Sequence, residues 1–354
     1  MKVVTVVGAR PQFIKAAPVS KALRKAGHTE FLLHTGQHYD HGMSQVFFEG
    51  LGLPAPDINL DVRSGEHGAQ TGRMLEGIEA VLLAEKPDWV VVYGDTNSTL
   101  AGALAAVKIH IPLAHVEAGL RSHNRRMPEE HNRILTDHCA DLLLCPTKTA
   151  VENLTKEGLT RGVHEVGDPM YDAVLMFSQK AKERSNIVKK LGLQRGCYIL
   201  VTIHRAYNTD DPAALKTILS VLQAVKETIV FPVHPRTLQK LKEYDLESSI
   251  QKNLFLIDPV DYLDMLMLEQ NARMILTDSG GIQKEAYFFA VPCLTLRPET
   301  EWVETIQSGW NLLVGIDLEK ILGGLKHTFP LADRQPELFG NGHSAATIVR
   351  LLGS

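Results

Sequence analysis

Short runs of β-branched and aliphatic residues alternate with amphipathic, helix-like stretches along nearly all of the 354 residues. The helix-like stretches cover residues 14–25, 72–85, 98–108, 212–227, 281–289 and 344–352. The strand-like runs cover residues 2–7, 30–36, 88–95, 111–119, 140–147, 196–205, 228–235, 253–259, 272–281 and 291–297. Strands and helices that alternate with short turns form parallel sheets covered by helices. The pattern therefore predicts an α/β protein with doubly wound, Rossmann-like sheets.

A chain of this length is expected to form two domains. Strand signals lapse between residues 167 and 190, where a charged helical stretch intervenes. We therefore predict an N-terminal domain over residues 1–168 and a C-terminal domain over residues 169–340. Doubly wound sheets bind ligands beyond the carboxyl ends of their strands, so we expect the active site in a cleft between the two domains.

The composition bears on partners and compartment. The formal net charge is −4, so neither nucleic acid nor a membrane surface is an expected partner. No apolar run approaches the roughly 20 residues of a membrane-spanning helix, and the first residues carry charge too early for a signal peptide. The four cysteines show neither CxxC spacing nor the density of a disulfide framework. We therefore expect a cytoplasmic protein.

Polar residues directly follow most of the predicted strands. These residues are Arg10, Lys15, Gln37, His38, Asp95, His115, Glu117, His204, Arg205, His234, Arg236, Asp278 and Ser279. Parallel strands end at one edge of a sheet, so we expect these side chains to gather along that edge in each domain. A random surface would not concentrate polar groups at nearly every such position.

The sequence TDSGGIQKEA (277–286) is the clearest candidate anion site. A strand ends, the turn Ser279–Gly280–Gly281 exposes backbone N–H groups, and a helix begins. Such a helix start carries a partial positive charge and unpaired donors, which suit a phosphate. Glu285 follows about one and a half turns later, where a carboxylate can bind sugar hydroxyls. The alternative is a tight turn that holds no ligand.

The first turn, VGARPQ (7–12), lacks the GxGxxG pattern, which argues against a nicotinamide dinucleotide in the first domain. Arg10 and Lys15 are instead candidates to hold a pyrophosphate, Arg10 through paired hydrogen bonds and Lys15 as a point charge. The alternative is a pair of solvated cations. Cations at a helix start oppose the helix dipole, so some other interaction is expected to hold them there.

The densest polar run is HVEAGLRSHNRRMPEEHNR (115–133). Together with Asp95, its carboxylates are candidates for acid–base chemistry, because neighbours and burial can separate the pKa values of clustered acids. The alternative is a surface helix covered with salt bridges. There is no HExxH, and no PCxxC follows Glu117, so no metal site is predicted. The absence of a GxSxG elbow argues against a serine hydrolase.

Seven motifs in order resemble the non-hydrolysing UDP-N-acetylglucosamine 2-epimerases. The motifs are GARPQFIK, TGQH, VYGDTNST, HVEAGLRS, MPEEHNR, HPRT and LTDSGGIQKEA, and the likeness spans roughly residues 1–350. The resemblance implies the two-domain GT-B fold, in which a last helix, here residues 341–354, packs back on the first domain. It also implies a homodimer that uses neither metal nor cofactor and takes a UDP-sugar as its substrate.

The resemblance also implies a reaction and a set of residues. The family eliminates UDP to give a 2-acetamidoglucal and then adds UDP back after protonation of the opposite face. By carry-over, Asp95, Glu117 and Glu129 are the catalytic carboxylates, and His204 lies near the leaving pyrophosphate. Which carboxylate is acid and which is base stays open, because coupled groups titrate as a set. The residues implied for UDP, sugar or orienting contacts are Arg10, Lys15, Gln37, His38, Arg133, His234, Ser279, Gly280, Gly281 and Glu285.

Some segments depart from the common family pattern. ETEWVET (299–305) has Trp302 where the common form has arginine, and the loop before PEE reads SHNRRM. These forms look like a subgroup that acts on UDP-2,3-diacetamido-2,3-dideoxy-glucuronate in O-antigen and capsule pathways. Arg125 or Arg126 is then a candidate partner for the C6 carboxylate, and a solvated loop is the alternative.

Three other functions compete with the epimerase interpretation. A GT-B glycosyltransferase would share the nucleotide-sugar domain, but it would need only an acceptor base rather than a set of carboxylates. A hydrolysing epimerase would share the elimination step and differ in the fate of the intermediate. A nucleotide-sugar sensor would not need so many acid and base groups opposite a phosphate site. The three carboxylates of the first domain therefore favour an epimerase over a glycosyltransferase or a sensor.

Overall fold

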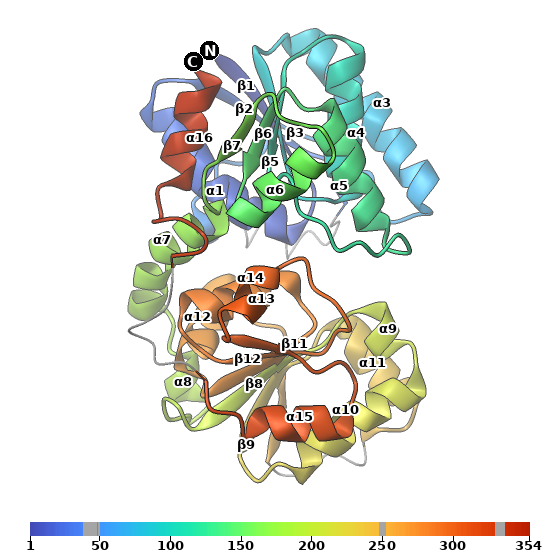
Figure 1. Cartoon of the computed structure of the whole chain (residues 1–354), viewed down its shortest axis with the longest axis vertical. Coiled ribbons are helices and arrows are strands. Elements are labelled where there is room, and N and C mark those ends of the chain that lie inside the picture. Colours follow the sequence, from blue (N-terminus) through green and yellow to red (C-terminus); the bar gives the residue numbers. More distant parts are fainter. Residues whose placement is uncertain (38–47, 49, 248–252, 330–336) are drawn as a thin grey trace. The chain divides into compact units, whose positions relative to one another are not determined.

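The computed structural model describes residues 1–37, 48, 50–247, 253–329 and 337–354. Contacts within the chain divide it into two compact units, Met1–Met176 with Glu337–Ser354 and Phe177–Pro336. Each unit contains a parallel sheet with helices packed against it (Figure 1). The prediction of two doubly wound, Rossmann-like units is confirmed. The domain limits predicted at residues 168 and 340 stay a prediction.

The first unit is built on a seven-stranded parallel sheet in the order β3-β2-β1-β4-β5-β6-β7. Its strands are β1 (Lys2–Val7), β2 (Thr29–His34), β3 (Ile58–Asn59), β4 (Trp89–Tyr93), β5 (Leu113–Val116), β6 (Leu142–Cys145) and β7 (Val163–Glu165). Its helices are α1 (Arg10–Lys25), α3 (His67–Glu85), α4 (Asn97–Lys108), α5 (Pro128–Cys139), α6 (Lys148–Lys156) and α16 (Ser344–Leu352), and α7 (Pro169–Arg184) begins in it.

The central strands of this sheet are buried on both faces, which explains their continuous valine runs. Val4, Val6, Val90 and Val92 are fully buried in one core with residues of α3 and α4. A strand covered by helices on both sides has no polar face, so it loses the alternating pattern of a half-exposed strand. β1 pairs in parallel with β2 on one side and β4 on the other. The chain order therefore reverses between β1 and β4.

The second unit contains a six-stranded parallel sheet in the order β10-β9-β8-β11-β12-β13. Its strands are β8 (Tyr198–Thr202), β9 (Thr228–Pro232), β10 (Leu254–Ile257), β11 (Met274–Thr277), β12 (Cys293–Thr295) and β13 (Asn311–Leu313). The helices are α8 (Ile187–Lys190), α9 (Ala206–Thr209), α10 (Pro212–Ala224), α11 (Pro235–Glu243), α12 (Tyr262–Asn271), α13 (Gly280–Phe288), α14 (Val303–Gln307) and α15 (Leu318–Leu325). Here the chain order reverses between β8 and β11. Such reversal points are where doubly wound sheets bind ligands.

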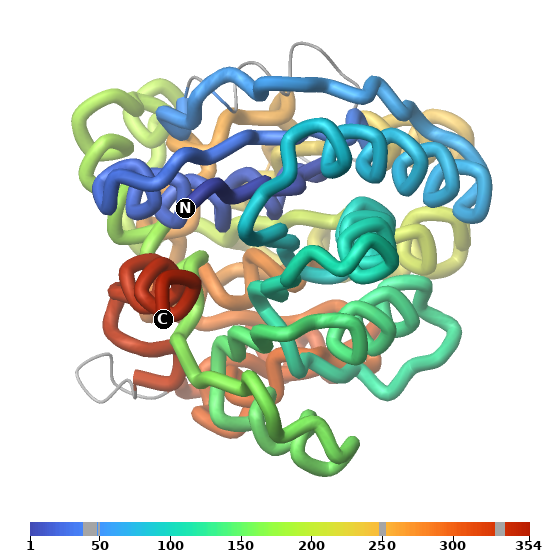
Figure 2. The backbone as a smooth tube through the Cα atoms, turned by 90° about the horizontal axis from the view of Figure 1, so that it is seen from above, coloured from blue at the N-terminus to red at the C-terminus, as the bar shows by residue number. Residues whose placement is uncertain are grey.

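The C-terminal helix α16 lies beside α1 in the first unit, and the two chain ends come close together (Figure 2). Asp172 of α7 holds the start of α16, because its carboxylate accepts hydrogen bonds from the N–H groups of Ser344 at 3.1 Å and Ala345 at 2.8 Å. The backbone N–H of Asp168 also donates to the carbonyl of Phe339 at 3.0 Å. Residues 337–354 thus dock on the unit that begins the chain.

Replacing Asp172 with Ala should loosen α16 without unfolding the sheet. The carboxylate satisfies two helix-start N–H groups, and losing such a cap costs about 1 kcal/mol. Hydrogen exchange of the α16 amides should therefore speed up about fivefold relative to the parent protein, while amides of β1 and β4 keep their rates. Asp172→Asn retains one acceptor oxygen and should have a smaller effect. Unchanged exchange in the Ala variant would show that packing alone holds the helix.

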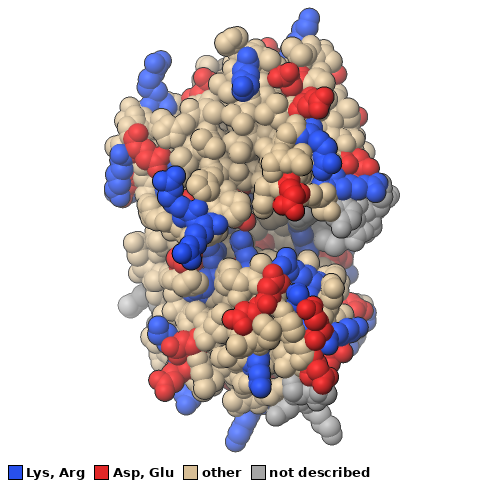
Figure 3. Space-filling model, turned by 90° about the vertical axis from the view of Figure 1, so that its right-hand side faces the viewer, with Lys and Arg blue, Asp and Glu red and all other residues tan. Residues whose placement is uncertain are grey.

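No helix in the described parts of the chain is long and apolar enough to cross a membrane. On the face drawn in Figure 3, acidic and basic side chains are interspersed over the described surface.

Candidate active site

The turn between β1 and α1 packs closely against the end of β2 and the start of α4. Gly8 has no room for a side chain, because an added Cβ would lie 2.1 Å from Oγ1 of Thr35 and 2.2 Å from Oγ of Ser98. The Gln12 side chain accepts hydrogen bonds from the N–H of Gly8 at 2.7 Å and Ala9 at 3.0 Å. Its amide nitrogen donates to the carbonyl of Tyr93 at 2.8 Å. Gln12, which the sequence analysis did not single out, thus joins the β1 and β4 ends.

Lys15 and Glu117 form a buried ion pair at this edge of the first sheet. The Lys15 ammonium lies 2.5 Å from Oε1 of Glu117, and their side chains are 8% and 5% exposed. Glu117 directly follows β5 and has a φ of +72°, a left-handed conformation that is uncommon for residues other than glycine. Gly94, after β4, lies beside the pair. Within the unit, Lys15 therefore contacts a predicted catalytic carboxylate.

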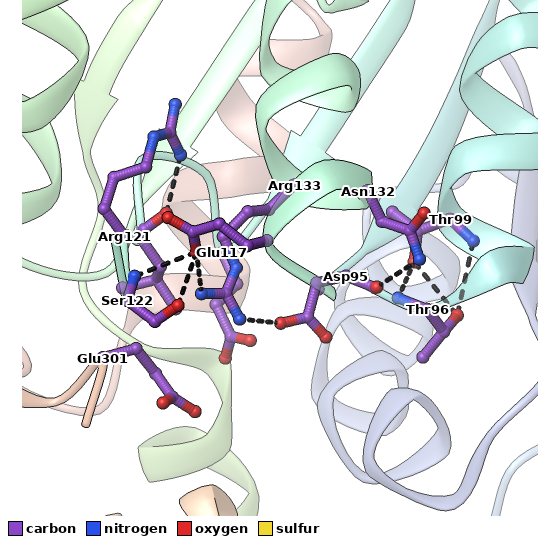
Figure 4. Close-up of polar contacts among 12 residues, drawn as sticks. Asp95, Thr96, Thr99, Glu117, Arg121, Ser122, Asn132, Arg133 and Glu301 are labelled. Carbon is purple, nitrogen blue, oxygen red and sulfur yellow. Dashed lines mark hydrogen bonds and ion pairs between the residues drawn. The ribbon is translucent and has the colours of Figure 1, made fainter. Parts of the chain in front are cut away.

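Arg133 holds two further carboxylates together (Figure 4). Its guanidinium group donates to Asp95, which follows β4, and to Oε2 of Glu130 at 2.8 Å. Arg133 is 2% exposed, whereas the Asp95 side chain is 27% exposed and reaches solvent. An arginine on the second turn of a helix can bridge two acids because its guanidinium group carries several donors. Arg133 was predicted to orient the carboxylates, and it contacts Asp95.

The two glutamates of the PEE motif lie in different environments. Glu130 is buried and accepts hydrogen bonds from the N–H groups of Ser122 at 2.9 Å and His123 at 2.8 Å. Burial acts to raise the pKa of Glu130, but the Ser122 N–H and the Arg133 charge outweigh it and lower that pKa overall. Glu129, the predicted catalytic residue, is half-buried on the first turn of α5. The buried role of Glu130 was not anticipated from the sequence.

Other predicted residues of the first unit lie around this group. Gln37 accepts a hydrogen bond from the Ser98 hydroxyl at 2.7 Å, which ties the β2 end to the start of α4. Arg10 is the first residue of α1 and is partly exposed. His38 lies outside the described residues. Direct ion pairs thus hold four of the predicted residues. Lys15 of α1 pairs with Glu117 after β5, and Arg133 of α5 pairs with Asp95 after β4.

In the second unit, buried Asp278 organises the two turns beside the reversal point. It accepts hydrogen bonds from the N–H of Arg205 at 2.9 Å and from the side-chain amide of Asn208 at 3.0 Å. It also accepts from the N–H of His204 and lies 3.3 Å from that residue's Nδ1. Thr202 and Thr277, the last residues of β8 and β11, share a hydrogen bond of 2.6 Å. The loop after β8 is therefore fixed to the loop after β11.

The turn at residues 279–281 opens α13 as predicted. Ser279 precedes the helix with an extended backbone and makes no side-chain capping bond. A Cβ on Gly280 would lie 2.6 Å from Oε1 of Glu301 and 3.2 Å from Nε1 of Trp302, so a larger residue there would require the Glu301 carboxylate to move. Farther along the helix, the buried Glu285 accepts a hydrogen bond from the Tyr262 hydroxyl at 2.8 Å.

His204 and His234 lie side by side, with ring centroids 6.0 Å apart. His234 is exposed, and its Nδ1 accepts a hydrogen bond from the N–H of Arg236 at 3.2 Å, capping α11. The His204 side chain is 40% exposed. The structure therefore places His204, His234 and Ser279 after adjacent strands of one sheet edge. Within the described residues no group of histidine, cysteine or carboxylate side chains is arranged to hold a metal ion.

Trp302, at which the sequence departs from the common family pattern, lies against the helix that follows this turn. The Lys284 ammonium lies 3.8 Å from the centroid of its indole ring, and both residues are buried. Arg297 pairs with Glu301 at 3.0 Å. The aromatic ring thus takes up a cation–π contact beside Gly280.

Two Rossmann-like units, each with its polar residues at the reversal point of a parallel sheet, define the GT-B class of nucleotide-sugar proteins. A family model described as UDP-N-acetylglucosamine 2-epimerase matches residues 21–353, and the chain belongs to that family. The resemblance found in the sequence is confirmed. Family membership makes the chain a nucleotide-sugar epimerase, which is an isomerase.

Individual relatives match this chain over nearly its full length. A UDP-N-acetylglucosamine 2-epimerase homolog of Methanococcus maripaludis is 54% identical, with 99% of both chains covered. The UDP-2,3-diacetamido-2,3-dideoxy-D-glucuronate 2-epimerase of Pseudomonas aeruginosa is 48% identical, again over 99% of both chains. The crystal structure of Methanocaldococcus jannaschii UDP-GlcNAc 2-epimerase in complex with UDP-GlcNAc and UDP is 45% identical, with a TM-score of 0.93. It is matched over 100% of this chain and 99% of that one.

Proposed function

We propose that this protein is a non-hydrolysing UDP-N-acetylglucosamine 2-epimerase that interconverts UDP-GlcNAc-type and UDP-ManNAc-type sugars. The observation that carries the proposal is that two carboxylates, Asp95 and Glu117, lie at the carboxyl ends of strands in the first sheet. Each of them forms an ion pair with a buried cation. The M. jannaschii relative, whose crystal structure contains UDP-GlcNAc and UDP, supports a UDP-sugar as the substrate.

The chemistry explains why several carboxylates are needed. The C2 proton of the sugar has no adjacent carbonyl, so its direct removal would leave an unstabilised carbanion. In the proposed reaction a base takes the C2 proton while the bond from C1 to the UDP oxygen breaks, which gives a 2-acetamidoglucal and UDP. An acid then protonates C2 from the opposite face and UDP adds back to C1. Asp95, Glu117 and Glu129 form the acid–base set in this proposal, and their individual roles stay unassigned.

The second unit is proposed to hold the nucleotide. The N–H groups of the turn Ser279–Gly280–Gly281, at the start of the nine-residue helix α13, suit a phosphate. Glu285 is proposed to bind the ribose, and His204 and His234 to contact the pyrophosphate with Arg10. Positive and N–H groups there would stabilise the charge that develops on departing UDP. Lys15 was predicted to bind phosphate. In this proposal it does so while it is also paired with Glu117.

Three further features belong to the proposal on the strength of the family. The protein is proposed to act as a homodimer in the cytoplasm and to supply sugars for a cell-surface polysaccharide. The cleft between domains, and the contacts of Gln37 and His38 with the substrate, stay predictions.

Proton NMR in D₂O, without added NAD or metal, tests the function directly. The enzyme should introduce deuterium at C2 of UDP-GlcNAc and form a manno-configured nucleotide sugar, because the elimination exchanges that proton with solvent. UDP-2,3-diacetamido-2,3-dideoxy-glucuronate is the second substrate to test, since the P. aeruginosa relative carries that activity in its name. No exchange with either sugar, by folded protein that still binds UDP, would contradict the proposal and favour glycosyl transfer. Release of free N-acetylmannosamine would identify a hydrolysing enzyme.

A further inference from the structure

The turn that carries Glu117 has an unusual backbone that its neighbours must hold. Glu117 has a φ of +72° and Gly119 a φ of +80°, so two left-handed residues lie within three positions. A left-handed conformation at a residue other than glycine persists only when the surroundings enforce it. The N–H groups of Glu117 and Ala118 both donate to the carbonyl of Leu144, at 3.1 and 3.3 Å. These bonds fix one side of the turn.

Asp137 fixes the other side of the turn. This side chain of α5 is fully buried. It accepts hydrogen bonds from the N–H of Gly119 at 3.2 Å, from Nη1 of Arg121 at 2.7 Å and from Nδ1 of His115 at 2.7 Å. Arg121 in turn makes a two-pronged ion pair with Glu157, at 2.6 and 2.7 Å. One carboxylate thus collects donors from three positions of the segment 115–121.

His115 connects this carboxylate to the turn that carries Asp95. The ring is fully buried on β5, and its Nε2 lies 2.7 Å from the carbonyl oxygen of Gly94. A carbonyl oxygen only accepts hydrogen bonds, so Nε2 is a donor. Asp137 already accepts from Gly119 and Arg121, so Nδ1 donates to it as well. His115 therefore links the Gly94 carbonyl of the Asp95 turn to the Asp137 carboxylate, which in turn accepts from the N–H of Gly119 in the Glu117 turn.

We infer that His115 and Asp137 are a positioning pair that holds the turn of Asp95 and the turn of Glu117 in fixed relation to each other. Gly94 directly precedes Asp95, and Glu117 lies two residues beyond His115, so the pair spans both carboxylate-bearing turns. The inference rests on the proposed function, because it treats Asp95 and Glu117 as acid–base groups. Neither His115 nor Asp137 needs to touch the substrate.

Three variants test this pair, and the two at His115 separate the two hydrogen bonds of the ring. His115→Asn keeps a donor near the Nδ1 position and loses the bond to Gly94, whereas His115→Gln keeps a donor near Nε2 and loses the bond to Asp137. Asp137→Asn keeps the shape of the carboxylate and removes its charge. Each variant should lower kcat for epimerisation about 100-fold, because small displacements of catalytic groups cost that much. KM and the dissociation constant for UDP should stay at their parent values.

Glu30→Gln is the matched control. Glu30 is a partly buried carboxylate near the amino end of β2, where it accepts hydrogen bonds from Thr5 at 2.7 Å and from Ser20. This change removes a comparable charge from the opposite edge of the same sheet, so it should leave kcat unchanged at temperatures below melting. A crystal structure of Asp137→Asn should show that Glu117 has left the left-handed region.

The outcomes distinguish this inference from the proposed function. If the parent protein fails to epimerise, the proposed function is wrong. If the parent is active, Glu117→Gln is inactive and the His115 and Asp137 variants keep the parent kcat, the positioning role is wrong and the function stands. A loss of UDP binding that matches the loss of kcat would also overturn the inference, because it would indicate general damage to the fold.

Discussion

Replacing Glu117 with Gln should lower epimerisation about 1,000-fold, within the range that general acid–base catalysis supplies. The amide has nearly the shape of the carboxylate but can neither take nor deliver the proton at C2. Binding of UDP should stay close to that of the parent, because the turn proposed to hold phosphate lies in the second unit. Turnover is measured by deuterium incorporation at C2, and UDP binding by titration calorimetry.

Glu85→Gln is a suitable control for this experiment. Glu85 pairs with Lys2 at 2.7 Å on the partly exposed, amino-terminal side of the same sheet. Turnover of this variant should equal that of the parent. Parent-like turnover in Glu117→Gln would remove Glu117 from the acid–base set and leave Asp95 and Glu129 as its members.

The second large effect is expected on stability. Replacing Lys15 with Met takes the ammonium away from a carboxylate that is 5% exposed, and breaking a buried ion pair from one side costs about 3–5 kcal/mol. The double variant Lys15→Met with Glu117→Gln removes both charges, so its free energy of unfolding should recover much of that loss. Denaturant unfolding of the parent, both single variants and the double variant measures the coupling energy.

An additive result would contradict this account of the pair. If the two single losses simply sum in the double variant, Lys15 and Glu117 do not interact strongly in solution. Activity cannot decide the matter, because the double variant lacks Glu117 and should be inactive in either case. The stability cycle therefore tests the contact itself.

Most of the long strands were predictable from the sequence, because a strand covered on both faces by helices has an uninterrupted run of apolar residues. β1 and β4 are of this kind. The edge strands β3, β7 and β13 have only two or three residues, so they carry no run long enough to recognise. The dense polar run at 115–133 was singled out for its carboxylates, with a surface helix as the alternative, and α5 begins within it at Pro128.

The candidate site was predictable as a set of positions but not as a set of partners. Polar residues after parallel strands must share one edge, and that rule found Lys15, Asp95 and Glu117. The pairing of Lys15 with Glu117 joins residues 102 positions apart, and nothing local in either motif specifies it. Gln12 and Asp137 went unnoticed for the same reason, because their hydrogen-bond partners are distant in sequence.

The docking of residues 337–354 on the first unit has a consequence for the order in which the protein can assemble. On the ribosome, the strands β1 to β7 emerge early, but α16 is made only after the whole second unit has been synthesised. Until then the surface of α1 that packs against α16 is exposed, and the Asp172 carboxylate lacks the two N–H groups that donate to it in the folded protein. Completion of the first unit therefore depends on residues translated after the whole second unit, so a premature stop codon near residue 337 would damage a unit whose strands were made much earlier.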